Sequence, residues 1–277
     1  MNITDLKGTV ELSNGYPMPY LGLGTFKMSD GDEAYNAVRW ALDAGYRHID
    51  TASFYQNEKS VGRAIKDSGV AREDIFVTSK LWNSEQGYDN AFEAFDRSMK
   101  KLDVDYLDLY LVHWPVGGLF TESWKALEQF YNDGRVKTIG VSNFLIHHLK
   151  ELLKEARITP MVNQVEFHPY LVQQELIDFC HANGIQYEAW SPLMQGQILD
   201  EPLLKQLAEK YGKSVAQVVI RWNLQKDVVV IPKSSNKGRI AANAEVFDFE
   251  LSGEDVQKID GLDQNKRVGI HPDTFSS

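Results

Sequence analysis

The stretch Tyr106-Leu107-Asp108-Leu109-Tyr110-Leu111-Val112-His113 decides the fold of this chain. It is a short, nearly continuous apolar run that ends on a polar side chain, a pattern typical of a strand buried on both faces of a parallel sheet. Seven other runs of this kind occur along the sequence. The eight predicted strands are Tyr20–Gly24, Tyr46–Asp50, Ile75–Lys80, Tyr106–His113, Val136–Val141, Met161–Val165, Ile185–Trp190 and Val228–Ile231.

Helical periodicity fills the stretches between these runs. Phe92, Phe95, Met99 and Leu102 follow the spacing of one helix face, and Ser214 with Gln217 forms a capping box at the start of another helix. Alternating strands and helices favour parallel pairing, and eight strands close into a barrel filled by their own side chains. The sequence therefore predicts an α/β fold, a (β/α)8 barrel. Gly8–Pro19, with Asn14-Gly15 at its turn, predicts a hairpin before the barrel.

An open, doubly wound sheet is the alternative fold. Such a sheet usually carries a G-x-G-x-x-G loop after its first strand, but here the segment reads Gly22-Leu23-Gly24-Thr25-Phe26-Lys27. We therefore expect any nucleotide cofactor to be held in another way.

Length and composition exclude several classes of protein. The 277 residues suit one barrel domain spanning residues 1–277, since single α/β barrels of about 250 residues are common. A net charge of −10 gives no electrostatic footprint for nucleic acid or an anionic membrane. A single cysteine, Cys180, and the lack of a long apolar run favour a cytoplasmic protein without a membrane span. No large exposed apolar patch is indicated, so we expect a monomer.

The polar ends of the predicted strands converge on one kind of chemistry, because the reactive face of such a barrel lies at those ends. Asp50, Lys80 and His113 end three of the strands, and Tyr55 follows closely after Asp50. An ammonium beside a phenol lowers the pKa of the phenol, so Lys80 could make Tyr55 a better acid, while Asp50 pairs with Lys80 and His113 assists. Alone, each has an ordinary explanation, such as packing for Tyr55. The four together predict proton delivery to a carbonyl oxygen.

Other strand ends indicate a phosphate-bearing, flat ligand. Lys233 and Ser234 precede a predicted helix that contains Arg239, and a helix start with such groups suits a phosphate monoester, which points to NADP rather than NAD. Trp190 could stack on a heterocycle, although buried core packing explains a lone tryptophan equally well. Ser142, Asn143 and Gln164 could bind an amide, or could simply cap the helices that follow.

Several long motifs in a common order resemble the aldo-keto reductases over nearly the whole chain, and the prokaryotic-type glyoxal and diketo-gluconate reductases most of all. The matching segments are Gly45–Thr51 with Tyr55, Asn57 and Glu58; Thr78–Trp82; Asp105–Tyr110 with His113–Pro115; Gly140–Phe144; Val162–Gln164 with His168–Tyr170; and Ile231–Ser234.

The resemblance implies an NADPH-dependent reductase of small aldehydes and α-dicarbonyls, with hydride from the nicotinamide and a proton from Tyr55. It implies the catalytic residues Asp50, Tyr55, Lys80 and His113. The implied cofactor contacts are Gly24, Thr25, Asp50, Ser142, Asn143, Gln164, Trp190, Ser191, Leu193, Lys233, Ser234, Arg239 and Asn243. The implied substrate contacts are Phe26, Trp82, His113 and Trp114. Ala242 stands where the family often has a glutamate, which leaves the preference for NADPH over NADH open.

The short segment Val116–Phe120 and the short tail after Leu262 predict a shallow, open substrate site. Two other functions remain alternatives. One is a metal-dependent barrel hydrolase that would use His48, Asp50, His113 and His168, and the other is a non-catalytic NADPH-binding protein. The hydrolase alternative gives Tyr55 no role in the reaction. A protein that only binds NADPH has no need of an activated phenol such as that of Tyr55.

Overall fold

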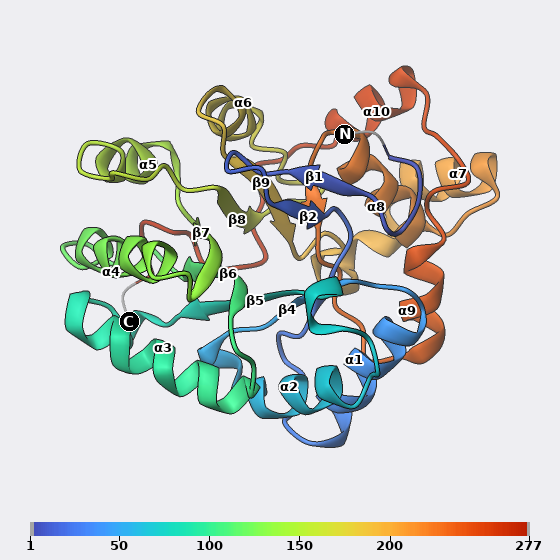
Figure 1. The fold of residues 1–277 in the computed structure, drawn as a ribbon. Coiled ribbons are helices and arrows are strands. Elements are labelled where there is room, and N and C mark those ends of the chain that lie inside the picture. Colours follow the sequence, from blue (N-terminus) through green and yellow to red (C-terminus); the bar gives the residue numbers. More distant parts are fainter. Residues whose placement is uncertain (1–2, 276–277) are drawn as a thin grey trace.

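A computed structural model describes residues 3–275, so both ends of the expected 1–277 domain lie outside the described residues. Eight parallel strands form one curled sheet with helices around its outside (Figure 1). Their order in the sheet follows their order in the chain. The strands are β3 (Leu23–Gly24), β4 (His48–Asp50), β5 (Phe76–Leu81), β6 (Leu107–Val112), β7 (Val136–Ser142), β8 (Val162–Glu166), β9 (Gln186–Trp190) and β10 (Val229–Val230).

The sheet closes into the predicted barrel between its first and last strands. Parallel bridges join Leu21 to Val230 and Gly24 to Lys233, and the amide of Gly22 donates to the carbonyl of Val230 at 2.9 Å. The sequence therefore predicted the eight strands and the (β/α)8 barrel correctly. The first strand is shorter than the predicted Tyr20–Gly24, because only isolated bonds link its beginning to Val230.

Helices follow the strands and cover their outer faces, as the alternating pattern predicted. They are α1 (Asp32–Asp43), α2 (Glu58–Lys66), α3 (Tyr88–Leu102), α4 (Phe120–Asn132), α5 (Ile146–Leu152), α6 (Gln174–Ala182), α7 (Pro202–Tyr211), α8 (Val215–Gln225), α9 (Lys237–Ala244) and α10 (Gly253–Asp260). Short 3-10 helices include η1 (Ser53–Tyr55) and η4 (Met194–Asp200). The predicted capping box is present at α8, where Ser214 and Gln217 each accept the other's backbone N–H.

The predicted hairpin is also present, as β1 (Thr9–Glu11) paired with β2 (Pro17–Pro19). The hydroxyl of Tyr16 in this hairpin donates to Asp108 near the start of β6, at 2.6 Å. The hairpin therefore lies at the amino ends of the strands and leaves their carboxyl ends free.

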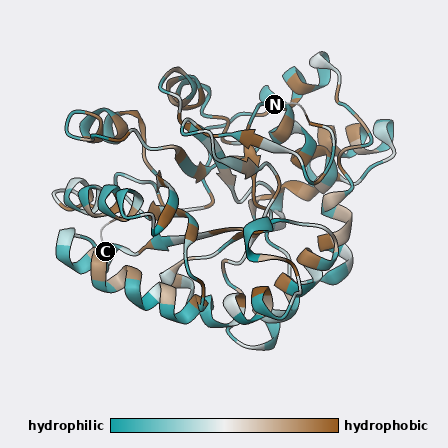
Figure 2. Cartoon of the chain, in the orientation of Figure 1, coloured by the Kyte–Doolittle hydropathy of each residue, from teal (hydrophilic) through white to brown (hydrophobic). Residues whose placement is uncertain are grey.

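Apolar side chains fill the barrel and the layer between the sheet and the helices. Figure 2 shows apolar residues along the strands and polar residues on the outer helix faces. Burial of this apolar surface is the main favourable term in folding. No helix within residues 3–275 is long and apolar enough to cross a membrane.

Candidate active site

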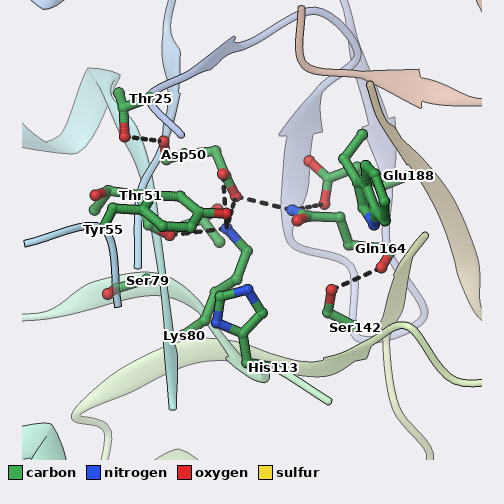
Figure 3. Close-up of polar contacts among 12 residues, drawn as sticks. Thr25, Asp50, Thr51, Tyr55, Ser79, Lys80, His113, Ser142, Gln164 and Glu188 are labelled. Carbon is green, nitrogen blue, oxygen red and sulfur yellow. Dashed lines mark hydrogen bonds and ion pairs between the residues drawn. The ribbon is translucent and has the colours of Figure 1, made fainter. Parts of the chain in front are cut away.

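The carboxyl ends of β4, β5 and β6 bring Asp50, Lys80 and His113 together, and η1 adds Tyr55 (Figure 3). The Lys80 ammonium is the centre of the group. Its Nζ lies 2.7 Å from both carboxylate oxygens of Asp50, 2.8 Å from the carbonyl of Thr51 and 3.3 Å from the hydroxyl of Tyr55. The four residues that the sequence singled out therefore lie together.

Lys80 and Asp50 form an ion pair that is almost fully buried. Burial alone would lower the pKa of Lys80, but the Asp50 carboxylate and the neighbouring Tyr55 and Glu188 raise it above its ordinary value. Lys80 is therefore charged at neutral pH, and its ammonium lies next to the Tyr55 hydroxyl oxygen.

The acidity of Tyr55 differs from the prediction. Burial raises the pKa of Tyr55 to about 12, and the Lys80 ammonium lowers it only in part. The sequence identified the sign of the Lys80 effect but could not show that burial outweighs it. Tyr55 thus keeps its proton at neutral pH, and the Lys80 ammonium lies where it would stabilise a phenolate.

His113 is an uncharged imidazole. Burial lowers the pKa of His113 well below its ordinary value, and the Lys80 ammonium lowers it further. The ring of His113 meets the Tyr55 ring edge-on, with 5.8 Å between centroids. Its Nδ1 has no hydrogen-bond partner among the described residues. A neutral imidazole here can donate one hydrogen bond to a carbonyl oxygen beside Tyr55.

Buried hydrogen bonds fix the loops that carry these side chains. Asn57 donates to the carbonyls of Thr25 and Met28, and accepts from the hydroxyl of Thr51 at 2.7 Å. The hydroxyl of Thr25 donates to the carbonyl of Asp50 at 2.9 Å. The loops after β3 and β4 are therefore linked, and Gly24 and Thr25 lie beside Asp50.

Of the three predicted amide-binding residues, Ser142 ends β7, Asn143 follows it, and Gln164 lies in the middle of β8. The hydroxyl of Ser142 donates to the carbonyl of Gln164 at 2.8 Å, and the Asn143 amide donates to the carbonyl of His113 at 2.9 Å. Gln164 donates to Asp50 at 2.8 Å. Hydrogen bonds therefore connect Asn143 to His113 and Gln164 to Asp50, the partner of Lys80.

Trp190 ends β9, and its indole is held on two sides. Its Nε1 donates to the side-chain oxygen of Asn143 at 2.9 Å. Against the outer edge of the ring lies Gly269 in the C-terminal tail, where an added Cβ would come within 2.4 Å of Cη2 of Trp190. Glu166 holds this part of the tail in place, because its carboxylate accepts hydrogen bonds from the backbone amides of Val268 and Gly269. No pattern in the sequence predicted this contact, since the tail has no periodicity.

The predicted phosphate-binding residues lie around the start of α9. Ser234 is buried, while Lys233 and Arg239 are exposed. Asn236 caps the helix by accepting from the amide of Arg239 at 3.0 Å. Asn243 lies buried on α9. Ser191 and Leu193 follow Trp190 in the loop that leads into η4.

The predicted substrate residues lie in a group of neighbouring aromatic rings, which the C-terminal tail joins. Phe26 lies against Tyr55 at 5.1 Å, and Trp82 lies against His113 at 5.1 Å between ring centroids. The tail returns over the barrel, and Phe275 stacks on Trp114 at 4.5 Å. The short tail therefore contributes one aromatic ring beside the predicted substrate residues, and the shallow, open site stays a prediction.

The proposed hydrolase centre does not form. His48 and His168 lie near Thr78 and Glu166 respectively, and the ligand atoms of His48, Asp50, His113 and His168 do not gather. In the described part of the chain, the one cluster with metal-like spacing is His147, His148 and Asp273, which includes none of these four residues. The geometry thus gives a metal-dependent hydrolase no centre at this site.

Comparison with known proteins agrees with this geometry. Residues 20–264 match the model of the Aldo/keto reductase family. The chain belongs to the aldo/keto reductase family. Glyoxal reductase of Bacillus subtilis (strain 168) is 58% identical over 270 residues, which cover 98% of this chain and 98% of that protein.

Solved structures of family members share the fold. MGS-M4, an aldo-keto reductase from a Medee basin deep-sea metagenome library, superposes with a TM-score of 0.95 at 49% identity, over 97% of this chain and 100% of that one. A mutant of Gox0644, crystallised in complex with NADPH, superposes with a TM-score of 0.92 at 41% identity, over 97% of this chain and 98% of that one.

Proposed function

We propose that this aldo-keto reductase uses NADPH to reduce small aldehydes and α-dicarbonyls, such as methylglyoxal and glyoxal, to alcohols. The observation that carries the proposal is the buried Lys80 ammonium 3.3 Å from the Tyr55 hydroxyl, with a neutral His113 beside it. The similarity to a glyoxal reductase and to a protein crystallised with NADPH supports the substrate class and the cofactor.

The side chains divide the work of proton transfer. When bound, the nicotinamide supplies the hydride for the carbonyl carbon. Tyr55 donates its proton to the carbonyl oxygen, and Lys80 stabilises the phenolate that remains. Asp50 keeps Lys80 charged and oriented through two 2.7 Å contacts. His113 donates a hydrogen bond to the same carbonyl oxygen and so sets its position.

The chain offers suitable groups for each part of the cofactor. Lys233, Ser234 and Arg239 lie at the start of α9, where exposed cations and backbone amides suit the 2′-phosphate. Asn243 is placed for the adenine. Ser142, Asn143 and Gln164 provide hydrogen-bonding groups for the carboxamide, and Trp190 provides the flat face. Gly24, Thr25, Ser191 and Leu193 complete the contacts along the cleft.

The aromatic side chains favour a small, flat substrate. Phe26 lies against Tyr55 and Trp82 lies against His113, while Phe275 packs on Trp82 and Trp114. Four rings around a short dicarbonyl exclude water and orient it, whereas a bulky ketone would have to displace Phe275. We further propose that the chain acts as a single catalytic domain, as a monomer, in the cytoplasm.

Arg239→Ala tests the phosphate site. We expect a roughly ten- to hundred-fold rise in the KM for NADPH, because a hydrogen bond to a charged group contributes about 1.5–3 kcal/mol. The KM for NADH, which lacks the 2′-phosphate, is expected to stay within about two-fold. Steady-state kinetics with both cofactors measure this. Lys154→Ala, which removes an exposed cation beyond α5, is the control, and an equal rise for both cofactors would contradict the assignment.

Gly269→Ala tests the support behind Trp190. The added methyl group would press on the indole, and overpacking costs about 1–3 kcal/mol. We therefore expect weaker NADPH binding and altered tryptophan fluorescence. Gly253→Ala is the matched control, because a Cβ at Gly253 meets no atom within 4 Å. Unchanged cofactor affinity in Gly269→Ala would show that the tail does not hold Trp190 in its binding position.

A panel of carbonyl compounds tests the proposed function as a whole. Purified protein is mixed with NADPH and methylglyoxal, glyoxal, simple aldehydes or a bulky cyclic ketone, and loss of the reduced-nicotinamide absorbance is followed. We expect turnover with the small compounds and little with the bulky ketone. Binding of NADPH without turnover of any carbonyl would favour the non-catalytic alternative.

A further inference from the structure

Glu188 is a buried acid that the proposed mechanism does not use. It lies on β9, two residues before Trp190, and its side chain is fully buried inside the barrel. One oxygen of its carboxyl, Oε2, accepts a hydrogen bond from the Gln164 amide nitrogen at 3.0 Å (Figure 3). The other, Oε1, lies 3.6 Å from Nε2 of His48.

The Gln164 amide nitrogen bridges two carboxyl groups. It donates to Asp50 at 2.8 Å and to Glu188 at 3.0 Å, which uses both protons of the amide. The amide oxygen of Gln164 makes no hydrogen bond to the described residues, and it is not among the buried unpaired atoms. This oxygen is therefore the atom left to meet a ligand in the cleft, where it can accept from a carboxamide N–H.

Glu188 has no hydrogen-bonded cationic partner, and the nearby Lys80 ammonium lowers its pKa less than burial and the Asp50 charge raise it. The Lys80 ammonium has three protons, and Asp50, the Thr51 carbonyl and the Tyr55 hydroxyl already surround it. The groups that face Glu188 are His48 and Asp50 from β4, Lys80 from β5, Gln164 from β8 and Tyr55 from η1, while its partner on β10 is Val229. A second carboxylate in this cavity would be buried beside Asp50 without an ion-pair contact of its own to Lys80.

We propose that Glu188 is a positioning residue of the reductase site: as an uncharged carboxyl, it takes the second N–H of Gln164 and so fixes the Gln164 carbonyl oxygen toward the nicotinamide. Burial and the Asp50 charge raise the pKa of Glu188 to about 8, which agrees with a neutral carboxyl at pH 7. Burial also lowers the pKa of the facing His48 to about 3, so this imidazole is neutral as well.

Ionisation of Glu188 would oppose the chemistry of Tyr55. A negative charge on Glu188 raises the pKa of Tyr55, and it disfavours the phenolate that forms as Tyr55 gives up its proton. The rate of the chemical step should therefore fall as the pH rises through about 8. The predicted pH dependence of the chemical step rests on the proposed function. The predicted effect of Glu188 on NADPH affinity does not, because binding can be measured without turnover.

Three variants test the role of Glu188. Glu188→Gln keeps an oxygen to accept from Gln164 but cannot ionise. Glu188→Leu removes the acceptor and leaves a buried N–H unpaired. Glu128→Gln is the matched control, because Glu128 is a buried glutamate on α4 that accepts from Trp124 and from backbone amides. NADPH affinity is measured by fluorescence titration, and the chemical step by single-turnover rates across the pH range.

We expect Glu188→Leu to weaken NADPH binding roughly ten-fold, because the freed Gln164 amide can turn its oxygen away from the cofactor and a lost hydrogen bond to a polar partner costs about 1 kcal/mol. Glu188→Gln is expected to bind NADPH within about two-fold of the parent, yet to lose the decline in rate near pH 8. Glu128→Gln should change neither quantity. Parental affinity in Glu188→Leu, or a retained decline in Glu188→Gln, would overturn the proposal.

Unfolding without cofactor gives an independent measurement, which remains informative if Glu188→Leu does not fold. The pKa of folded Glu188 is raised above the ordinary 4.5, so the stability linked to this group is complete below about 4.5 and is lost as the pH rises through about 8. The parent should therefore lose stability relative to Glu188→Gln across that window. Parallel stability curves would contradict an uncharged Glu188. If no carbonyl is reduced, the proposed function fails, while affinity and unfolding still decide this inference.

Discussion

Replacing Lys80 with methionine is expected to destabilise the protein by about 3–5 kcal/mol, the usual result of removing one partner of a buried ion pair. The Asp50 carboxylate would remain inside the barrel with only the Gln164 amide to stabilise it. Turnover should also be lost, because nothing else among the described groups brings a positive charge to the Tyr55 oxygen. Urea unfolding and steady-state kinetics measure the two effects.

The loss of stability in Lys80→Met should depend on pH. Burial raises the pKa of Asp50, and without Lys80 nothing cationic opposes that effect. A carboxyl with a raised folded pKa contributes stability at low pH and loses it as the pH rises. The deficit should therefore be smaller in mildly acidic buffer than in neutral buffer.

A double variant, Asp50→Asn with Lys80→Met, is the control for this interpretation. It removes both charges, so we expect it to recover part of the stability lost in Lys80→Met, without recovering activity. A double variant that is less stable than Lys80→Met would show that the ion pair is not the reason for the loss.

Replacing Tyr55 with phenylalanine is expected to lower kcat by about a hundred- to ten-thousand-fold, the range that a positioned general acid contributes. The ring and its contacts with Phe26 and His113 remain, so cofactor affinity and stability should change little. Steady-state kinetics with methylglyoxal, together with an NADPH titration, measure both quantities.

Tyr110→Phe is the matched control for Tyr55→Phe. Tyr110 is also fully buried, and its hydroxyl has no hydrogen-bond partner among the described residues. Removing that hydroxyl should leave kcat unchanged. If Tyr55→Phe retained the parental kcat, the proton would have to come from another group.

The sequence predicted most of the barrel because its signals are local. Each strand is a short apolar run with a polar residue at or near its end, and the closed sheet brings these residues to one face. This made Asp50, Lys80 and His113 recognisable before their distances were known. The short β3 and β10 were overestimated, because their ends pair only through isolated bridges that depend on barrel closure.

Electrostatic properties were harder to predict. The sequence showed that Lys80 could acidify Tyr55, but the net pKa depends on burial, which is a property of the closed barrel. Glu188 escaped notice for a similar reason, since a glutamate in an apolar strand has no obvious partner. The available signal was the two-residue spacing of Gln186, Glu188 and Trp190 in β9. Residues at this spacing lie on the same side of a strand, so Glu188 faces the same way as Trp190.

The tail shows what local patterns miss. Gly269 and Phe275 have no periodic neighbours, yet they lie against Trp190 and Trp114. Their positions depend on contacts with distant residues, such as the bonds from the tail amides to Glu166. The length of the tail alone could not show that Phe275 returns to Trp114.

A single-turnover experiment tests the role of Tyr55 most directly. Protein loaded with one equivalent of NADPH is mixed with methylglyoxal, and both the NADPH consumed and the alcohol formed are quantified beside Tyr55→Phe. We expect one alcohol for each NADPH in the parent, and no detectable alcohol over the same interval in a Tyr55→Phe protein that still binds NADPH. Equal alcohol formation by the two proteins would contradict proton donation by Tyr55.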